Sequence, residues 1–323
     1  MRWLALVVIL AAELALADPT GSTPKPADSG SGSGSGVDRM ADPKTPLTSL
    51  TDDPLLGHSP RINGDEVHGV VAFTFDDGPN PETTPAVIGA LEKYDIPATF
   101  FIVTQRLLGK HGAAPRDLLT HELADHFLVG SHSVSHKLLK TAGPDLVAKE
   151  MDASFRTLAK EADRPIGLFR PPYGALSGAG RARLRQLGVT EVIWSIDTLD
   201  WKAHDADKLR KKVLKMILHD NGGVVLMHDV KPITAKIIAG VLDDLEAENC
   251  SRLAAKPAQE PIWPVSIHYF LRDAKNTSRA VPAEVQKRTD AYKVGLPNRC
   301  KNRAPVKEDS NPCLVNPLAK GCS

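Results

Sequence analysis

Short apolar runs alternate along the middle of the chain with stretches in which apolar residues recur at helical spacing. The apolar runs predict buried strands at 70–75, 98–103, 127–130, 168–169, 192–196 and 222–227. The helical spacing predicts helices at 83–94, 146–162, 181–187, 206–218 and 235–248. Continuous apolar strands that alternate with helices are typical of a parallel sheet buried on both faces. The pattern therefore indicates an α/β fold.

Two adjacent acids, Asp76 and Asp77, end the first of these strands and precede the turn residues Gly78 and Pro79. Neighbouring carboxylates resist burial unless a cation compensates their charge. Neighbouring residues of a strand also point to opposite faces of the sheet. We therefore expect one carboxylate to bind a metal ion while the other exchanges a proton.

A pair of histidines, His132 and His136, follows the apolar run at 127–130. Histidines four positions apart lie on one face of a helical turn, so we expect their ring nitrogens to converge on one ion. Two imidazoles and one carboxylate leave coordination positions open for water and substrate, which is typical of a catalytic metal site. A divalent ion bound in this way acts as a Lewis acid.

Three further strand ends carry ionisable groups. Arg170 precedes a Pro-Pro-Tyr-Gly turn, Asp197 and Asp200 follow the run at 192–196, and His228 ends the run at 222–227. An open sheet exposes a crevice to only a few of its strands, whereas a barrel brings all strand ends to one rim. The distribution of ionisable groups therefore favours a barrel.

The runs TFDDGP, HSVSH, RPPYG, DTLDW and LMH occur in this order between about residues 68 and 250. In these motifs and their intervals the chain resembles the polysaccharide deacetylases, which are family 4 of the carbohydrate esterases and related to the nodulation chitooligosaccharide deacetylase. The resemblance implies an α/β fold with a distorted, incomplete (β/α) barrel of about seven parallel strands.

The resemblance also implies a role for each matching residue. Asp77, His132 and His136 match the ligands of a divalent metal, and Asp76 matches the general base that activates the attacking water. Arg170 matches the arginine that positions this base. Zinc is our first expectation for the metal, with cobalt, nickel and manganese as alternatives, because such a ligand set does not select among them.

Further roles follow from the later motifs. The backbone of Tyr173 matches a donor to the oxyanion, and His228 matches the general acid that protonates the departing amine. Asp200 matches the acid that tunes this histidine. The residues expected to line the substrate pocket are Trp201, Leu226 and Pro172.

These observations predict an exported, metal-dependent hydrolase that removes N-acetyl groups from amino-sugar polymers and releases acetate. Peptidoglycan is the first substrate we expect, and chitin oligomers and poly-N-acetylglucosamine are close alternatives. An O-acetyl esterase acting on xylan would use the same residues. A non-catalytic glycan-binding module is a second class of function, although binding alone needs no base and acid. Hydrolysis of a small cyclic amide is a weaker alternative.

Composition changes this interpretation little. The chain has 323 residues, of which 42% are hydrophobic and 24% charged, as is ordinary for a globular protein. Its formal net charge of +1 gives no basis for nucleic-acid binding. Nothing in the sequence indicates an oligomeric state.

The ends of the chain differ from its middle. A positive residue, an apolar run and a small-residue cleavage site predict a signal peptide at 1–17, with retention as an uncleaved membrane anchor as the alternative. A flexible Pro/Ser/Gly-rich linker is predicted at 18–60, the deacetylase domain at 61–272 and a basic extension at 273–323. We therefore expect a secreted or periplasmic protein without a stable membrane insertion after cleavage.

All four cysteines lie late in the chain, at Cys250, Cys300, Cys313 and Cys322. In an exported protein an even number of cysteines predicts disulfides, and their spacing does not match a zinc site. We expect two disulfides that tie the extension to the domain, one of them joining Cys250 to another of the four. Few helix signals are present after residue 273.

Overall fold

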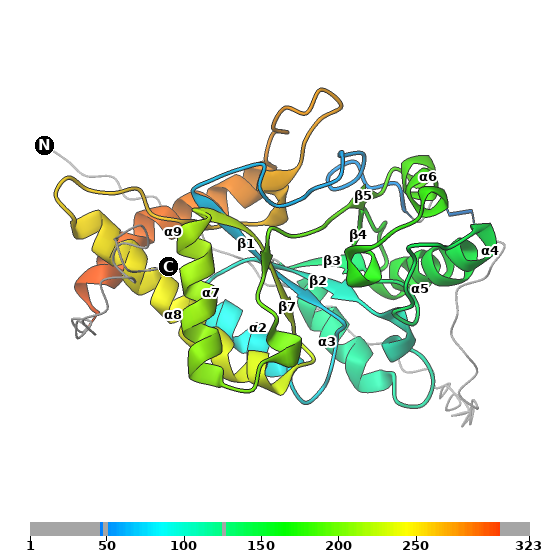
Figure 1. Ribbon diagram of the computed structural model, residues 1–323, viewed down its shortest axis with the longest axis horizontal. Helices are drawn as coiled ribbons and strands as arrows, with labels where there is room; N and C mark the ends of the chain where they lie inside the picture. Colours follow the sequence, from blue (N-terminus) through cyan, green and yellow to red (C-terminus); the bar gives the residue numbers. More distant parts are fainter. Residues whose placement is uncertain (1–45, 48–50, 125–126, 304–323) are drawn as a thin grey trace, which may run out of the picture. The chain divides into compact units, whose positions relative to one another are not determined.

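The computed structural model describes residues 46–47, 51–124 and 127–303. The strands are β1 (Val70–Asp76), β2 (Ala98–Ile102), β3 (Leu128–Ser131), β4 (Leu168–Phe169), β5 (Thr190–Glu191), β6 (Ile196–Asp197), β7 (Gly222–His228) and β8 (Trp263–Pro264). Their order is β5-β4-β3-β2-β1-β7-β6, with β8 beside the start of β1, and every pairing between them is parallel (Figure 1). The sheet curls into a half-barrel, so the predicted incomplete barrel of parallel strands is confirmed.

Helices connect the strands. They are α2 (Thr84–Lys93), α3 (Ala113–Ala124), α4 (Pro144–Val147), α5 (Ala153–Ala162), α6 (Gly178–Leu187), α7 (Ala206–His219), α8 (Pro232–Ala254) and α9 (Ala283–Lys301). A π-helical turn, Ala148–Asp152, joins α4 to α5. Helix α8 packs against both α7 and α2. Each of the five helices predicted from apolar spacing is present in the structure, with ends shifted by a few residues.

The sheet is curled because its two edge strands are close in sequence. Only residues 192–195 separate β5 from β6, although these strands lie at opposite ends of the strand order. A chain extends by at most about 3.5 Å per residue, so the two edges must approach one another. Ile62 pairs with Val192 in the gap, and Ser195 N donates to Val224 O. The continuous strand predicted at 192–196 is therefore wrong, because this segment crosses between the edges.

The residues of β1 alternate between two core clusters. Val71, Phe73 and Phe75 belong to the larger core cluster, which also contains helix residues. Ala72 belongs to a second cluster whose members include strand residues but none from α2, α7 or α8. Because side chains of a strand alternate between faces, Thr74 and Asp76 share the face of Ala72, inside the barrel.

Local signals explain where the helices begin. The side chain of Asp205 accepts a hydrogen bond from Lys208 N at the start of α7, which satisfies a donor that the helix leaves open. Leu209, Val213 and Ile217 follow at four-residue spacing and are buried, so one stripe of the helix faces the core.

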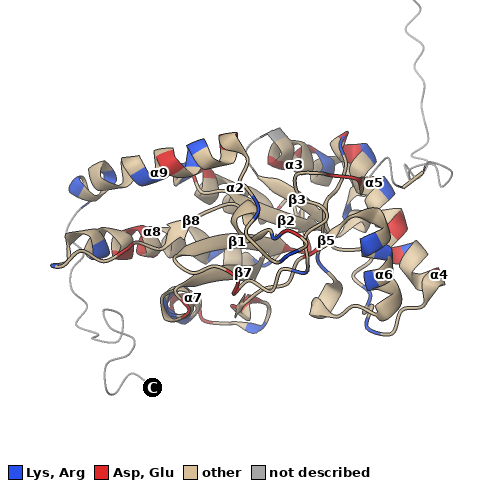
Figure 2. Ribbon diagram, turned by 90° about the horizontal axis from the view of Figure 1, so that it is seen from above, with Lys and Arg blue, Asp and Glu red and all other residues tan. Residues whose placement is uncertain are grey.

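Two helices were missed by the sequence analysis, α3 and α9. In α9 only Thr289, Tyr292 and Leu296 are buried, among many exposed charged residues. Their spacing of three and four positions is helical, but so few apolar residues in a long helix give a weak signal. The expectation of little helix after residue 273 was wrong. Figure 2 shows both signs of charge along α9 and α5.

Helix α9 is tied to α8 by a disulfide between Cys250 and Cys300, whose Cα atoms are 5.4 Å apart. Arg299 adds an ion pair to Glu246 of α8 at 2.7 Å. The predicted involvement of Cys250 is thus confirmed. The second predicted disulfide concerns Cys313 and Cys322, which lie outside the described residues.

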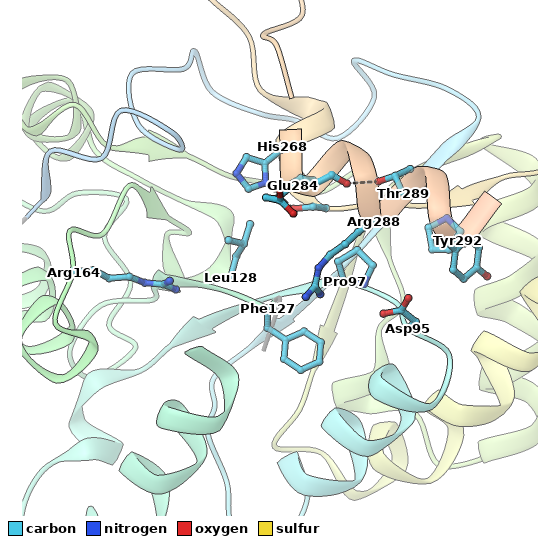
Figure 3. A pocket seen from close by; sticks show the side chains of 13 residues that line it. Asp95, Pro97, Phe127, Leu128, Arg164, His268, Glu284, Arg288, Thr289 and Tyr292 are labelled. Carbon is cyan, nitrogen blue, oxygen red and sulfur yellow. Dashed lines mark hydrogen bonds between the residues drawn. The ribbon is translucent and has the colours of Figure 1, made fainter. Parts of the chain in front are cut away.

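A cavity of about 250 Å³ lies between α9 and the amino-terminal ends of β2 and β3 (Figure 3). Pro97, Phe127 and Leu128 form its apolar side, and the side chains of Arg164 and Arg288 extend toward it. Since the strands are parallel, this cavity lies at the opposite end of the sheet from the predicted catalytic residues.

The chain contacts the barrel before β1. Leu56 is buried in the second core cluster, and His58 N donates to Gly188 O at 2.6 Å. Contacts with the barrel thus begin within the segment predicted as a linker. The predicted signal peptide and most of that linker lie outside the described residues. Within the described ranges, every helix is too short or too polar to span a bilayer.

Replacing both Cys250 and Cys300 with serine should destabilise the protein by about 4 kcal/mol, because the disulfide closes a loop with a sequence separation of 50. Urea unfolding of oxidised wild type and double variant, compared at the same pH, measures this difference. Equal unfolding midpoints would show that the disulfide contributes nothing to the stability of the domain.

Candidate functional site

The carboxyl ends of the parallel strands bring the predicted site residues together on one rim. These residues are Asp76 and Asp77 at the end of β1, His132 after β3, Arg170 after β4, Asp200 after β6 and His228 at the end of β7. The strand register places Asp76 opposite His228. Sequence-distant ionisable groups therefore lie on neighbouring strands at one level of the sheet.

Arg170 is completely buried and binds Asp76, which is 2% exposed. Its Nη1 donates to Asp76 Oδ1 at 2.7 Å and to Thr74 Oγ1 at 2.8 Å. Its Nε and Nη2 donate to the carbonyls of Val192 and Ile193 at 3.3 and 3.0 Å. The segment that crosses the barrel gap thus supplies acceptors that a buried guanidinium requires.

Two opposing effects act on the pKa of Arg170. Burial lowers the pKa of Arg170, and the charge of Asp76 and the hydrogen bond to it oppose this change. The guanidinium carbon also lies 4.2 Å from the centre of the Phe101 ring, where a cation is attracted to the ring face. The ion pair therefore fixes the position of Asp76 Oδ1, while Asp76 Oδ2 takes no part in the pair.

His132 is held in one tautomer. Its Nδ1 lies 2.7 Å from the backbone carbonyl of Arg170, and a carbonyl only accepts, so Nδ1 carries the hydrogen. The lone pair of Nε2 then faces Asp76 Oδ2 at 3.6 Å and Asp77 Oδ1 at 3.7 Å. A histidine oriented through its second nitrogen is typical of a metal ligand.

We had expected the two acids to point to opposite faces of the sheet, but they do not. Asp77 has a φ of 75°, in the left-handed region, so the strand alternation ends at this residue. Both carboxylates consequently approach the same nitrogen of His132. The reason is that Asp77 already belongs to the turn and not to β1, which ends at Asp76.

The predicted helical turn through the histidines is also wrong. Residues 132–137 form a loop, with φ values of 69° at Ser133 and 58° at His136. The loop is fixed by Glu150, whose carboxylate accepts from Ser135 N at 2.9 Å and from Ser135 Oγ at 2.6 Å. Ser133 Oγ accepts from His136 N at 3.1 Å. Side-chain hydrogen bonds thus replace the helix in bringing the histidines together.

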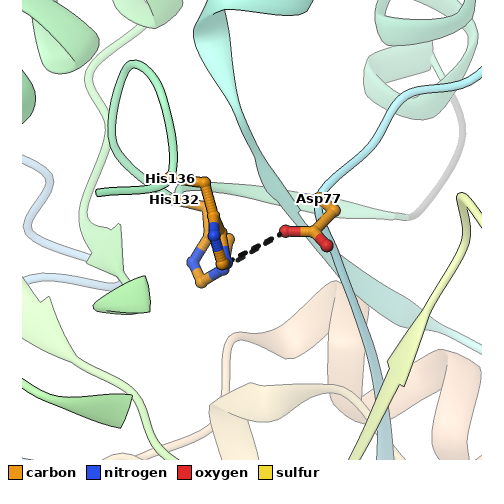
Figure 4. A group of neighbouring side chains, drawn as sticks. All are labelled: Asp77, His132 and His136. Atoms are coloured by element: carbon orange, nitrogen blue, oxygen red, sulfur yellow. Dashed lines mark ion pairs between the residues drawn. The ribbon is translucent and has the colours of Figure 1, made fainter. Parts of the chain in front are cut away.

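Asp77, His132 and His136 form a cluster in which one potential ligand atom of each residue lies within 4.8 Å of the others (Figure 4). His136 Nε2 is 3.3 Å from Asp77 Oδ1. That oxygen is buried and accepts no hydrogen bond from the described residues. Burial, followed by the charge of His132, lowers the pKa of His136 and favours its neutral form. A carboxylate oxygen without a donor, beside two imidazoles, fits a divalent cation.

His228 is paired with Asp200 on the other side of β1. Its Nδ1 is 2.7 Å from Asp200 Oδ1, while Oδ2 accepts from His228 N at 2.7 Å and from Thr234 Oγ1 at 2.5 Å. Burial lowers the pKa of His228, but the hydrogen bond and charge of Asp200 outweigh it and raise the pKa to about 9. His228 is therefore an imidazolium at neutral pH.

The remaining predicted residues differ in how far they are buried. Tyr173 has a φ of 59° in the turn Pro172–Gly174, and its ring meets His136 edge to face at 4.6 Å. Pro172 and Leu226 are buried. Trp201 is 54% exposed, with Lys202 Nζ 5.3 Å from its ring centre. Trp201 thus presents an open ring face to solvent and is not packed away in the core.

A cavity of about 420 Å³ opens beside the cluster. Its lining residues are Asp77, Val103, Gln105, Arg106, Ser135 and His136. Gln105 and Arg106 were not predicted, and neither were Glu150 and Thr234. No motif contains these residues, and Thr234, although close to His228 in sequence, contacts the distant Asp200.

Comparisons with known proteins point to one family. A family model described as polysaccharide deacetylase matches residues 63–192. The peptidoglycan-N-acetylglucosamine deacetylase PgdA of Listeria monocytogenes is 30% identical over 189 residues, which are 58% of this chain and 38% of that protein. This chain therefore spans well under half of the Listeria relative. A chitooligosaccharide deacetylase of Bradyrhizobium sp. is 32% identical over 175 residues, 53% of this chain and 77% of the relative.

A solved structure shares the fold. The Bc1960 peptidoglycan N-acetylglucosamine deacetylase superimposes with a TM-score of 0.54 at 23% identity, over 68% of this chain and 96% of that one. At this identity the similarity concerns the fold alone.

In metal-free protein, the imidazole of His228 should titrate with a pKa of about 9, and Asp200→Asn should lower this pKa, because it removes the hydrogen bond and the charge that raise it most and leaves only Asp76 and Asp77 to oppose burial. Because the folded pKa exceeds the unfolded value, protonated His228 stabilises the fold at low pH, and this contribution is lost as pH rises through about 9.

Histidine NMR titration of both proteins measures this shift. His268, whose pKa burial lowers to about 4, serves as an internal reference that should not move. An unchanged His228 titration in Asp200→Asn would contradict the assignment of Asp200 as its partner.

Proposed function

We propose that this chain, which belongs to the polysaccharide deacetylase family, hydrolyses N-acetyl groups of an amino-sugar polymer and releases acetate. The observation that carries the proposal is the placement of two proton-exchanging groups around one candidate metal cluster. Asp76 Oδ2 is 3.6 Å from His132 Nε2 of the cluster, and His228, which is paired with Asp200, is opposite Asp76 on the neighbouring strand β7. A binding module needs no such pair, whereas amide hydrolysis needs both a base and an acid.

Asp77, His132 and His136 would hold a divalent cation, with zinc as the first choice and cobalt, nickel or manganese as alternatives. When bound, such a cation polarises the acyl oxygen and makes water a better nucleophile. The Arg170 carbonyl orients His132 through its Nδ1, and burial favours the neutral form of His136 by lowering its pKa.

Asp76 would act as the general base. Arg170 occupies Oδ1, so the proton of the attacking water goes to Oδ2, which faces the cluster. The ion pair holds Asp76 in one orientation, and pre-orientation of this kind avoids reorganisation during the reaction. The water oxygen then bonds to the acyl carbon, and the backbone N–H of Tyr173, in the turn Pro172–Gly174, would stabilise the charge that develops on the acyl oxygen.

His228 would complete the reaction as the general acid. The Asp200 bond at Nδ1 leaves the Nε2 proton for the leaving group. When the carbon–nitrogen bond breaks, the sugar nitrogen takes this proton and departs as an amine, and acetate remains. A pKa of about 9 keeps His228 protonated at neutral pH, so activity should decline on the alkaline side.

The named relatives guide the choice of polymer and location. One carries the name of a peptidoglycan deacetylase and another that of a chitooligosaccharide deacetylase. We propose peptidoglycan first and chitin-like polymers second. The Cys250–Cys300 disulfide is suited to an oxidising compartment, which supports a secreted or periplasmic location.

Removal of divalent cations with a chelator should abolish acetate release from peptidoglycan or chitohexaose, and zinc or cobalt should restore it. His132→Ala should bind substoichiometric zinc in a direct binding measurement, because it loses one of three ligands. His219→Ala, which removes an exposed histidine at the end of α7, is the matched control. Release from acetylated xylan alone would instead indicate an O-acetyl esterase, and chelator-resistant release would rule out the metal site.

Asp76→Asn should lower kcat by about a hundredfold or more, since it removes the base while keeping the shape of the side chain. Asp205→Asn is the control, because asparagine also caps a helix and this residue lies outside the site. Acetate release at saturating substrate measures the effect. A loss of less than about twofold would exclude Asp76 as the base.

A further inference from the structure

We infer that Arg106 is a specificity-determining residue that binds a carboxylate of the polymer beside the acetamido group to be cleaved. The inference rests on the proposed deacetylation and adds which polymer is favoured. Arg106 lies in the 3₁₀ turn Thr104–Leu107 directly after β2, and it lines the 420 Å³ cavity together with Asp77 and His136. None of the motifs in the sequence contains it.

The guanidinium of Arg106 is anchored but only partly used. Its Nε donates to the backbone carbonyl of Asp77 at 2.5 Å, which fixes the side chain against the site. Among the described residues it forms no ion pair with a carboxylate. Its side chain is exposed, so the Nη1–Nη2 edge remains available for a ligand. That planar edge matches the two oxygens of a carboxylate.

The nearby charge of Asp229 does not account for the free Nη1–Nη2 edge of Arg106. Asp229 is the buried acid whose pKa the charge of Arg106 helps to lower, against a burial effect that raises it to about 7. Asp229 Oδ2 accepts from Thr84 Oγ1. Asp229 Oδ2 therefore has a donor, and its buried Oδ1 accepts no hydrogen bond from Arg106 or from any other described residue, whereas Arg106 is exposed and lines the cavity.

The position of Arg106 relative to the reacting groups determines which part of the polymer it can contact. β2 and β7 flank β1 on opposite sides, so Arg106 and His228 lie on opposite sides of Asp77. A polymer whose acetamido group reaches the cluster and whose nitrogen faces His228 would place the rest of that sugar, or its neighbour, toward Arg106. The side chain of Gln105, in the same cavity lining, offers an amide to sugar hydroxyls.

This arrangement discriminates among the candidate polymers. Chitin and poly-N-acetylglucosamine are neutral, and their deacetylated stretches are cationic, so Arg106 would repel a chain that has already lost acetyl groups nearby. The muramoyl sugar of peptidoglycan carries a lactyl group that ends in a carboxylate or in a carboxylate-bearing peptide. Arg106 thus favours a carboxylate-substituted amino-sugar polymer over a neutral one.

The test compares three substrates: peptidoglycan glycan strands with free carboxylates, the same strands with these carboxylates converted to methyl amides, and chitohexaose. Full-length wild type and Arg106→Gln are assayed for kcat and KM at low and high salt. Glutamine keeps an N–H for the Asp77 carbonyl but removes the charge. Arg288→Gln, which makes the same change at the opposite end of the sheet, is the control.

Wild type should prefer free over amidated strands by about tenfold or more in kcat/KM, mainly through KM, and salt should weaken the preference. Arg106→Gln should abolish the preference for free over amidated strands. A preference that persists in Arg106→Gln, or is missing in wild type, overturns the inference. Equal losses on all three substrates would mean that Arg106 only positions Asp77, and would overturn it too.

Calorimetric binding of the strands keeps this test separate from the deacetylase proposal. In the Asp76→Asn background, free strands should bind more tightly than amidated strands by a similar factor, and adding Arg106→Gln should remove the difference. If wild type releases acetate from none of the substrates, the proposed function fails, and the binding comparison still decides the role of Arg106.

Discussion

The buried ion pair between Arg170 and Asp76 is the interaction on which the site depends. A charged group without access to water is tolerated only when every polar atom is paired, and Arg170 meets this condition through Asp76, Thr74 and two backbone carbonyls. Those carbonyls come from the segment that crosses between the edges of the half-barrel. The incomplete closure of the sheet and the orientation of Asp76 therefore have one structural cause. The carbonyl of Arg170 extends the same network to His132.

The rim of the barrel separates groups whose pKa values move in opposite directions. Burial lowers the pKa of His136, which has a second imidazole for a neighbour, whereas Asp200 raises that of His228 although His228 is the more buried of the two. The two histidines differ because only His228 has a dedicated carboxylate, itself held by Thr234. One edge of a sheet thus offers a neutral imidazole suited to a cation and a protonated imidazole suited to a leaving group.

Residues in short turns after the strands surround the rim. Arg106 and Gln105 follow β2, and the exposed ring of Trp201 follows β6, so all three lie in short turns at the carboxyl ends of the strands. At the other end of the strands, α9 and the Cys250–Cys300 disulfide cover the base of the barrel. Chemistry and stability are thus assigned to opposite ends of the same strands.

The sequence by itself determined the parallel α/β barrel and the identity of the ionisable groups on its rim. It could do so because apolar periodicity and strand-end position are local properties, which the sequence shows directly around Asp76, Arg170 and His228. The tertiary structure decided what depends on contacts between distant segments. It replaced the expected histidine helix by a loop held by Glu150, turned Asp77 toward His132, split the run at 192–196 across the barrel gap, and brought Arg106 to the cavity. Each of these results follows from a hydrogen bond or a backbone turn whose partner is remote in sequence, and no local pattern encodes such a partner.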